Sequence, residues 1–131
     1  MATKKNLAFV FPGQGSQSSG MLGELAQEYS VVKDTFAEAS EAFGLDMWSL
    51  VQEGPESKLG LTEITQPVML VSGVACWRAW QKASTVVPAV MAGHSLGEYT
   101  AYVCADAMSL EEGVRLGQNV DEVCNAIALT L

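Results

Sequence analysis

The pentapeptide 93–97 reads Gly-His-Ser-Leu-Gly and directly follows the apolar run 88–92. A G-x-S-x-G sequence between a strand and a helix is typical of a nucleophile elbow, a sharp turn that projects a serine at the carboxyl end of a strand. The two glycines leave room where backbones close up, because a Cβ at either position would clash. Ser95 is therefore the candidate nucleophile, and a turn with purely structural glycines is the alternative.

An elbow at Ser95 would also supply part of an oxyanion hole. The helix that follows directs its positive N-terminal end at the reacting centre, and the backbone N–H of Leu96 can donate to an oxyanion. His94 is the only histidine of the sequence. Adjacent side chains on such a turn diverge, whereas a general base must come within about 2.6–3.2 Å of its proton. We therefore expect His94 to pack or orient the elbow, which leaves the chain without a general-base histidine.

A second glycine-rich segment, residues 11–17, reads Phe-Pro-Gly-Gln-Gly-Ser-Gln and follows the apolar run 7–11. It is not a dinucleotide fingerprint, because Ser18 occupies the place of the third glycine. It is not a phosphate-binding P-loop either, since Met21 stands where the lysine is needed. An amide-rich loop at the end of a strand is a usual source of the second oxyanion N–H in serine acyl-transfer sites. A plain surface turn is the alternative.

Strand and helix patterns alternate along the chain, which predicts an α/β fold with a parallel sheet and helices on both faces. The apolar run 88–92 is expected to be a wholly buried strand, and Pro67 to stand at the first position of a helix. Two strands are too few for a complete sheet, so the chain looks like part of a larger domain. Its open edges should associate with copies of itself or with a partner. The predicted helices span residues 21–29, 32–43, 68–81 and 97–104, with a last helix capped by Ser109 and Glu112.

The charge balance excludes one class of partner. The sequence has 7 Lys and Arg against 15 Asp and Glu, a net charge of −8, and nucleic-acid binding needs clustered basic residues. The 3 cysteines form no C-x-x-C pair, so neither a metal site nor a disulfide framework is expected. No apolar run reaches the roughly 18 residues of a membrane span, and no signal peptide is evident. We expect a cytoplasmic protein.

Three motifs together resemble the malonyl-CoA:acyl carrier protein transacylases of bacterial fatty-acid synthesis and the acyltransferase domains of polyketide synthases. They are residues 11–17, the pair Gln66-Pro67, and residues 93–99. The resemblance runs from about Leu7 to Leu116. It implies an α/β-hydrolase-like large subdomain and no cofactor. It also implies transfer of malonyl from coenzyme A, through a seryl ester, to the phosphopantetheine thiol of acyl carrier protein.

The resemblance assigns roles to individual residues. Ser95 matches the nucleophile, and the backbone amides of Gln14 and Leu96 match the oxyanion hole, so the Gln14 side chain should matter little. Gln66 and His94 match neighbours of the substrate pocket.

The sequence departs from the resemblance after Leu116. By spacing, Val120 stands where the family has an arginine that pairs with the malonyl carboxylate. The tail 117–131 is divergent, although its apolar spacing is compatible with a helix. The catalytic histidine and the ferredoxin-like small subdomain of the family are absent. Residues 1–116 are thus expected to be the N-terminal part of an acyltransferase domain, inactive alone. A serine hydrolase or thioesterase on the same elbow and a non-catalytic fragment remain the alternatives.

Overall fold

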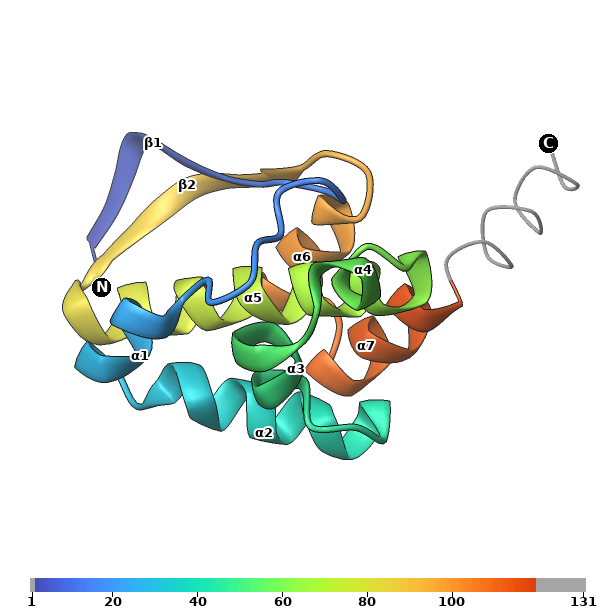
Figure 1. Cartoon of the computed structure of the whole chain (residues 1–131). Helices are drawn as coiled ribbons and strands as arrows, with labels where there is room; N and C mark the ends of the chain where they lie inside the picture. The colour runs from blue at the N-terminus through green and yellow to red at the C-terminus, as the bar shows by residue number, and fades with distance from the viewer. Residues whose placement is uncertain (1, 120–131) are drawn as a thin grey trace, which may run out of the picture.

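The computed structural model of the chain describes residues 2–119. A parallel two-stranded sheet lies over a layer of helices, and the long helix α5 runs beneath both strands (Figure 1). The elements are β1 (Ala2–Phe11), α1 (Gly23–Glu28), α2 (Val31–Phe43), α3 (Met47–Glu53), α4 (Glu56–Leu59), α5 (Thr62–Ala83), β2 (Val86–Gly93), α6 (Gly97–Cys104) and α7 (Leu110–Gln118).

The two strands pair in parallel and end together. Phe11, the last residue of β1, pairs with Gly93, the last residue of β2, so the loops that follow both strands leave from one edge. The register shifts between Lys4 and Ala8, opposite the part of β2 that contains Pro88. Proline has no N–H to give to a ladder and is found at such irregularities. The shift leaves the pairing regular from Ala8 onward, which is the part that carries the candidate site.

The sheet is held on α5 by aromatic packing. Phe9 meets Trp77 and Trp80 edge to face, with ring centroids 5.2 and 5.3 Å apart. Gly73 allows the close approach, because a Cβ there would lie 2.5 Å from Thr100 Cγ2 and 3.2 Å from the Phe11 ring. Over residues 7–11 the side chains of β1 alternate, with Phe9 and Phe11 facing α5, as a half-buried strand requires.

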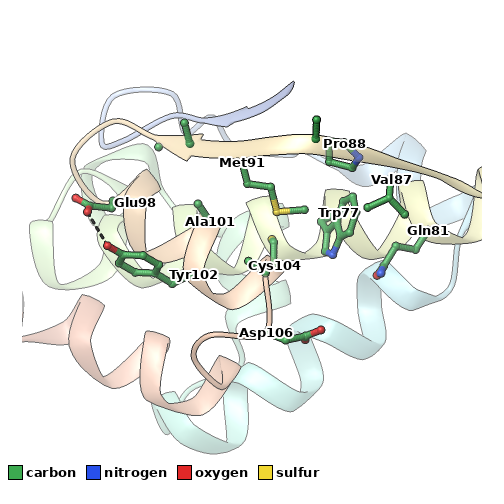
Figure 2. Close-up of a pocket in the computed structure, with 14 residues that line it drawn as sticks. Trp77, Gln81, Val87, Pro88, Met91, Glu98, Ala101, Tyr102, Cys104 and Asp106 are labelled. Atoms are coloured by element: carbon green, nitrogen blue, oxygen red, sulfur yellow. Dashed lines mark hydrogen bonds between the residues drawn. The ribbon is translucent and has the colours of Figure 1, made fainter. Parts of the chain in front are cut away.

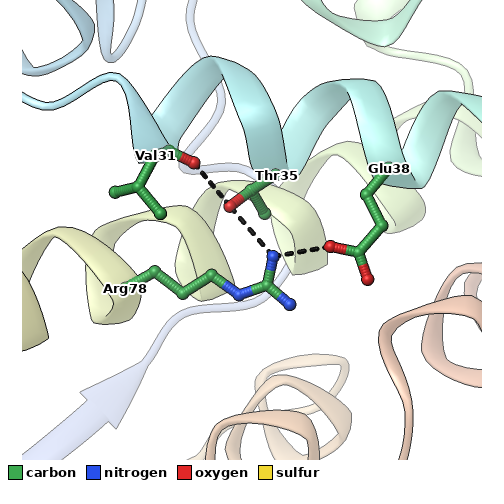
Figure 3. Close-up of polar contacts among 4 residues, drawn as sticks. All are labelled: Val31, Thr35, Glu38 and Arg78. Atoms are coloured by element: carbon green, nitrogen blue, oxygen red, sulfur yellow. Dashed lines mark hydrogen bonds and ion pairs between the residues drawn. The ribbon is translucent and has the colours of Figure 1, made fainter.

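Helix α2 closes the opposite side of α5. Its apolar stripe is buried, as the period of the sequence predicts, and Gly44 ends the helix with φ 88°. Arg78 of α5 adds a polar link to α2 (Figure 3): it donates to Glu38 at 2.7 Å and to Thr35 at 3.2 Å. The Arg78–Glu38 pair is partly exposed, so it contributes at most about 1 kcal/mol.

The α/β class and the parallel sheet are confirmed, and so is the capping box of Ser109 and Glu112. The predicted helix start at Gln66-Pro67 is wrong, because α5 begins at Thr62 and contains Pro67. A proline inside a helix removes one hydrogen bond and crowds the carbonyl four residues earlier, at a cost of about 3 kcal/mol, so the surrounding packing must offset it. Burial supports the helix here: from Ile64 to Ser72 every residue is buried.

The strand 88–92 is not wholly buried, contrary to expectation. Only Pro88 is buried, and Val90 is 57% exposed; on β1, Val10 is 71% exposed. The physical reason is visible in Figure 1, where the helices of the described residues lie on one face of the sheet. Helices on a second face, expected of the complete fold, are not among residues 2–119. The expected boundary at residue 116 lies within α7. Of the tail 117–131, residues 120–131, which include Val120, lie outside the described residues.

Candidate active site

The turn between β2 and α6 has the backbone of a nucleophile elbow. Ser95 adopts φ 55°, one of the few positive values at a non-glycine residue in the described chain. A Cβ at Gly93 would lie 1.9 Å from the Gly97 carbonyl carbon, and one at Gly97 would lie 2.0 Å from the Phe11 carbonyl oxygen. No side chain fits at either position. The glycines therefore have a steric role on both sides of a strained serine.

Backbone hydrogen bonds fix the elbow to the end of β1. The His94 N–H donates to the Phe11 carbonyl at 3.1 Å, and the Gly97 N–H donates to the His94 carbonyl at 3.0 Å. Glu98 N–H donates to the Ser95 carbonyl at 3.1 Å, which starts the first turn of α6. His94 thus ties the elbow to β1 through its backbone, while its side chain is exposed.

The loop after β1 packs against the elbow at Gly13. A Cβ on this buried glycine would lie 3.0 Å from the His94 carbonyl oxygen and 3.3 Å from Ser95 Cβ. The chain therefore brings Gln14 within one residue of the contact with the candidate nucleophile. The backbone N–H groups of Gln14 and Leu96 donate to no acceptor within the described part of the chain. Two free N–H groups beside a serine are what an oxyanion hole requires.

The side chain of Gln14 has partners that the sequence did not predict. Gln66 Nε2 donates to Gln14 Oε1 at 2.9 Å, and Gln14 Nε2 reaches Thr62 Oγ1 at 3.5 Å. Gln66 and Thr62 both lie on the first turns of α5. The sequence places Gln14 and Gln66 in separate motifs, and only the path of α5 brings them together over a separation of 52 residues.

Gln66 is 7% exposed, and its Oε1 atom has no hydrogen-bond partner among the described residues. A buried acceptor without a partner costs about 1–3 kcal/mol of desolvation. Within residues 2–119, the Nε2 group of Gln66 is therefore hydrogen-bonded to the Gln14 loop, whereas its Oε1 atom accepts no hydrogen bond.

A groove of about 800 Å³ lies beside β2 (Figure 2), and of the elbow residues 93–97 only Gly93 lines it. Met91, Trp77 and Tyr102 line it, and Ser95 and Gln14 do not. Tyr102 donates to Glu98 at 2.9 Å, and this hydrogen bond raises the pKa of the Tyr102 hydroxyl. The groove follows the edge of β2 that pairs with no strand in residues 2–119, so it belongs to the sheet edge rather than to the serine.

Nothing in residues 2–119 clusters three metal-ligating side chains. In the same part of the chain, no helix is both long and apolar enough to cross a membrane.

Residues 8–120 match the protein family described as acyl transferase domain. The chain belongs to this family. The match of the acyl transferase domain extends to residue 120, a few residues beyond the expected end of the resemblance at Leu116.

Named relatives of this acyl transferase domain are longer. The chain is 57% identical over 109 residues to the malonyl CoA-acyl carrier protein transacylase of Salmonella typhimurium, covering 83% of this chain and 35% of the relative. A crystal structure of an acyl carrier protein S-malonyltransferase from Vibrio cholerae superposes with a TM-score of 0.83 at 55% identity, covering 85% of this chain and 36% of that one.

A malonyl-transacylase solved in complex with a type II PKS acyl-carrier protein superposes with a TM-score of 0.82 at 50% identity. It covers 90% of this chain and 37% of the solved one. The chain thus spans about a third of the length of the relatives that it matches.

Proposed function

We propose that this acyl transferase domain is the nucleophile-bearing part of an enzyme that moves malonyl from coenzyme A to the phosphopantetheine thiol of acyl carrier protein. The observation that carries the proposal is the contact between two loops. The elbow presents Ser95 at φ 55°, and Gly13 lies against it; beside the serine are two backbone N–H groups, of Gln14 and Leu96, that no acceptor within residues 2–119 takes up. The names of the relatives indicate malonyl as the acyl group and acyl carrier protein as the acceptor.

The reaction would proceed in two half-reactions. Ser95 Oγ attacks the thioester carbonyl of malonyl-CoA as a base removes its proton, and the C–S bond breaks to release coenzyme A as its thiol. In the second half-reaction the phosphopantetheine thiol attacks the seryl ester, loses its proton to the same base, and Ser95 Oγ leaves with a proton. No oxidant, metal or cofactor enters this balance.

The backbone N–H groups of Gln14 and Leu96 would bind the oxyanion of both tetrahedral intermediates. A preorganised donor of this kind is worth about 10²–10³-fold in turnover. The start of α6 lies directly behind Ser95 and adds its positive end. Gln66 and His94 would flank the pocket, His94 through the backbone bond that fixes the elbow.

The chain as given does not hold every group that the reaction needs. Its one histidine, His94, is the neighbour of Ser95 on the turn, so the base would come from the part of the enzyme that the relatives have in addition. We assign residues 1–116 to the N-terminal part of the α/β domain on this ground. Fatty-acid biosynthesis in the cytoplasm is the setting that fits the named relatives.

A chimera tests the proposal, with residues 1–116 replacing the aligned part of the Salmonella typhimurium relative. We expect malonyl transfer from coenzyme A to acyl carrier protein that greatly exceeds malonyl-CoA hydrolysis, and no transfer in Ser95→Ala. Hydrolysis without transfer would instead identify a serine hydrolase or thioesterase. A correctly folded chimera that neither turns over substrate nor reacts at Ser95 with a fluorophosphonate would refute a catalytic role.

A further inference from the structure

We propose that Gln66 is a positioning residue, which holds the backbone N–H of Gln14 toward Ser95 through the hydrogen bond between the two side chains. The proposal rests on the acyl-transfer function proposed above. The Gln14 side chain would then anchor the loop, whereas the role expected from the sequence involves only its backbone N–H.

The first step is that, beyond the packing of Gly13 on the elbow, the Gln14 loop has no other hydrogen-bonded anchor among the described residues. Between Pro12 and Ser19, the only hydrogen bonds to distant parts of the described chain are those of the Gln14 side chain, to Gln66 and Thr62. The bond from Gly15 N–H to Gln17 is local. The next tie to the body of the protein is Gly20 N–H to the carbonyl of Val51 at 2.9 Å.

The second step is that the loop cannot set the direction of the Gln14 N–H by itself. Gln14 is flanked by Gly13 and Gly15, and Gly15 adopts φ 109°, a conformation that other residues rarely take. Glycine has the widest choice of backbone angles. A catalytic donor must be held within a fraction of an ångström of its productive position, so an external anchor is needed.

The third step is that stability does not account for Gln66. The side chain is 7% exposed, and its buried Oε1 atom accepts no hydrogen bond from any residue of 2–119. An apolar side chain of similar size would remove this buried acceptor, and Gln14, which is exposed, could bond to water in place of Gln66, so the replacement should cost little stability. Residues that lower stability in this way are typical of functional sites, which favours a role of Gln66 in the site around Ser95.

The first experiment needs no catalysis and uses the 131-residue chain. Gln66→Leu and Gln14→Ala each remove the same hydrogen bond, one from the buried side and one from the exposed side. We expect both to lower the order parameters S² of the backbone N–H groups at 13–16 from about 0.85, typical of a rigid backbone, to below about 0.6, because the loop loses its anchor. Ser72→Ala is the matched control, since Ser72 is a buried polar residue of α5 that bonds only to Val68 of its own helix.

The second experiment measures malonyl transfer in the chimera. Gln66→Leu should lower kcat by about 10–100-fold with little change in KM, below the 10²–10³-fold expected for complete loss of an oxyanion donor. In a Gln14→Ala background the same substitution should cost nothing further, because the two residues act through one bond. A residue that merely stabilises the fold would lower the melting temperature without this coupling.

The outcomes separate the two proposals. Unchanged order parameters at 13–16 in Gln14→Ala and Gln66→Leu overturn the positioning role, whatever the activity. Multiplicative losses of kcat in the double variant also overturn it, since Gln66 would then act elsewhere. Lowered order parameters at 13–16 in the two variants, together with a chimera whose Ser95 forms no acyl adduct, support the anchoring of the loop and refute the proposed function.

Discussion

A Cβ atom on Gly97 would stand 2.0 Å from the carbonyl oxygen of Phe11. The first residue of α6 therefore touches the last residue of β1, although the two are far apart in the sequence. Phe11 also accepts the His94 N–H at 3.1 Å. The end of β1 is thus the surface on which the elbow is built, and the position of the Ser95 backbone depends on it.

We expect Gly97→Ala to lower the free energy of unfolding by about 1–3 kcal/mol, the usual cost of overpacking a close contact. The contact is with backbone, so no side chain can rotate away. Urea unfolding of the 131-residue chain measures the change. Gly60→Ala is the matched control, because a Cβ there meets only ordinary contacts, the nearest at 3.5 Å. Equal effects of the two substitutions would contradict the steric role of Gly97.

The fold should be more stable with glycine than with alanine at position 95. Its φ of 55° lies in the left-handed region, which costs roughly 1–2 kcal/mol for a residue with a Cβ. Glycine avoids this cost, but its greater conformational entropy in the unfolded state offsets part of the gain in stability. We expect the free energy of unfolding of Ser95→Gly to be about 0.5–1 kcal/mol higher than that of Ser95→Ala. At Ser57, in the ordinary helix α4, the order should reverse. Alanine more stable than glycine at position 95 would show that the turn is unstrained.

Alkaline pH should destabilise the fold through Cys104. Burial raises the pKa of its thiol from 9.0 to about 12. The folded state keeps the thiol neutral while the unfolded state ionises above about pH 9, so this stability is present below pH 9 and is lost between about pH 9 and 12. Unfolding free energies at pH 8 to 11, under reducing conditions, should fall less steeply in Cys104→Ala than in the parent. Parallel curves would show that Cys104 does not contribute.

The 131-residue chain alone should transfer malonyl about a millionfold more slowly than the chimera, the cost of removing the base from a serine protease. A serine hydroxyl is a weak nucleophile without an adjacent base, and the one histidine of the sequence lies beside Ser95 on the turn. Steady-state transfer to acyl carrier protein measures the difference. The preparation must be free of host transacylase, for which Ser95→Ala is the control. Comparable turnover would mean that another side chain of this chain serves as the base.

The sequence was sufficient for features that depend on local chemistry. The apolar stripe of α2 and the capping box of Ser109 and Glu112 were predicted because the signal lies within one or two turns. The elbow was predicted because its two glycines have a steric reason that holds in any sheet. Its steric setting agrees with the structure, although the catalytic role of Ser95 remains a proposal.

The features that failed depend on what covers each element. Pro67 was read as a helix start, but the buried stretch around it keeps α5 helical beyond the first turn. The strand ending at Gly93 was read as buried, yet Val90 faces outward because the helices of residues 2–119 lie on one side. The bond between Gln14 and Gln66 was missed because it requires the placement of a loop on a helix 52 residues away.

The most direct measurement is the intact mass of the chimera after a brief exposure to malonyl-CoA. We predict one malonyl adduct, located on Ser95 by peptide mapping, absent in Ser95→Ala and removed when acyl carrier protein bearing its phosphopantetheine thiol is added. An adduct that persists in Ser95→Ala, or a folded chimera that acquires none, would contradict the assignment of Ser95 as the nucleophile.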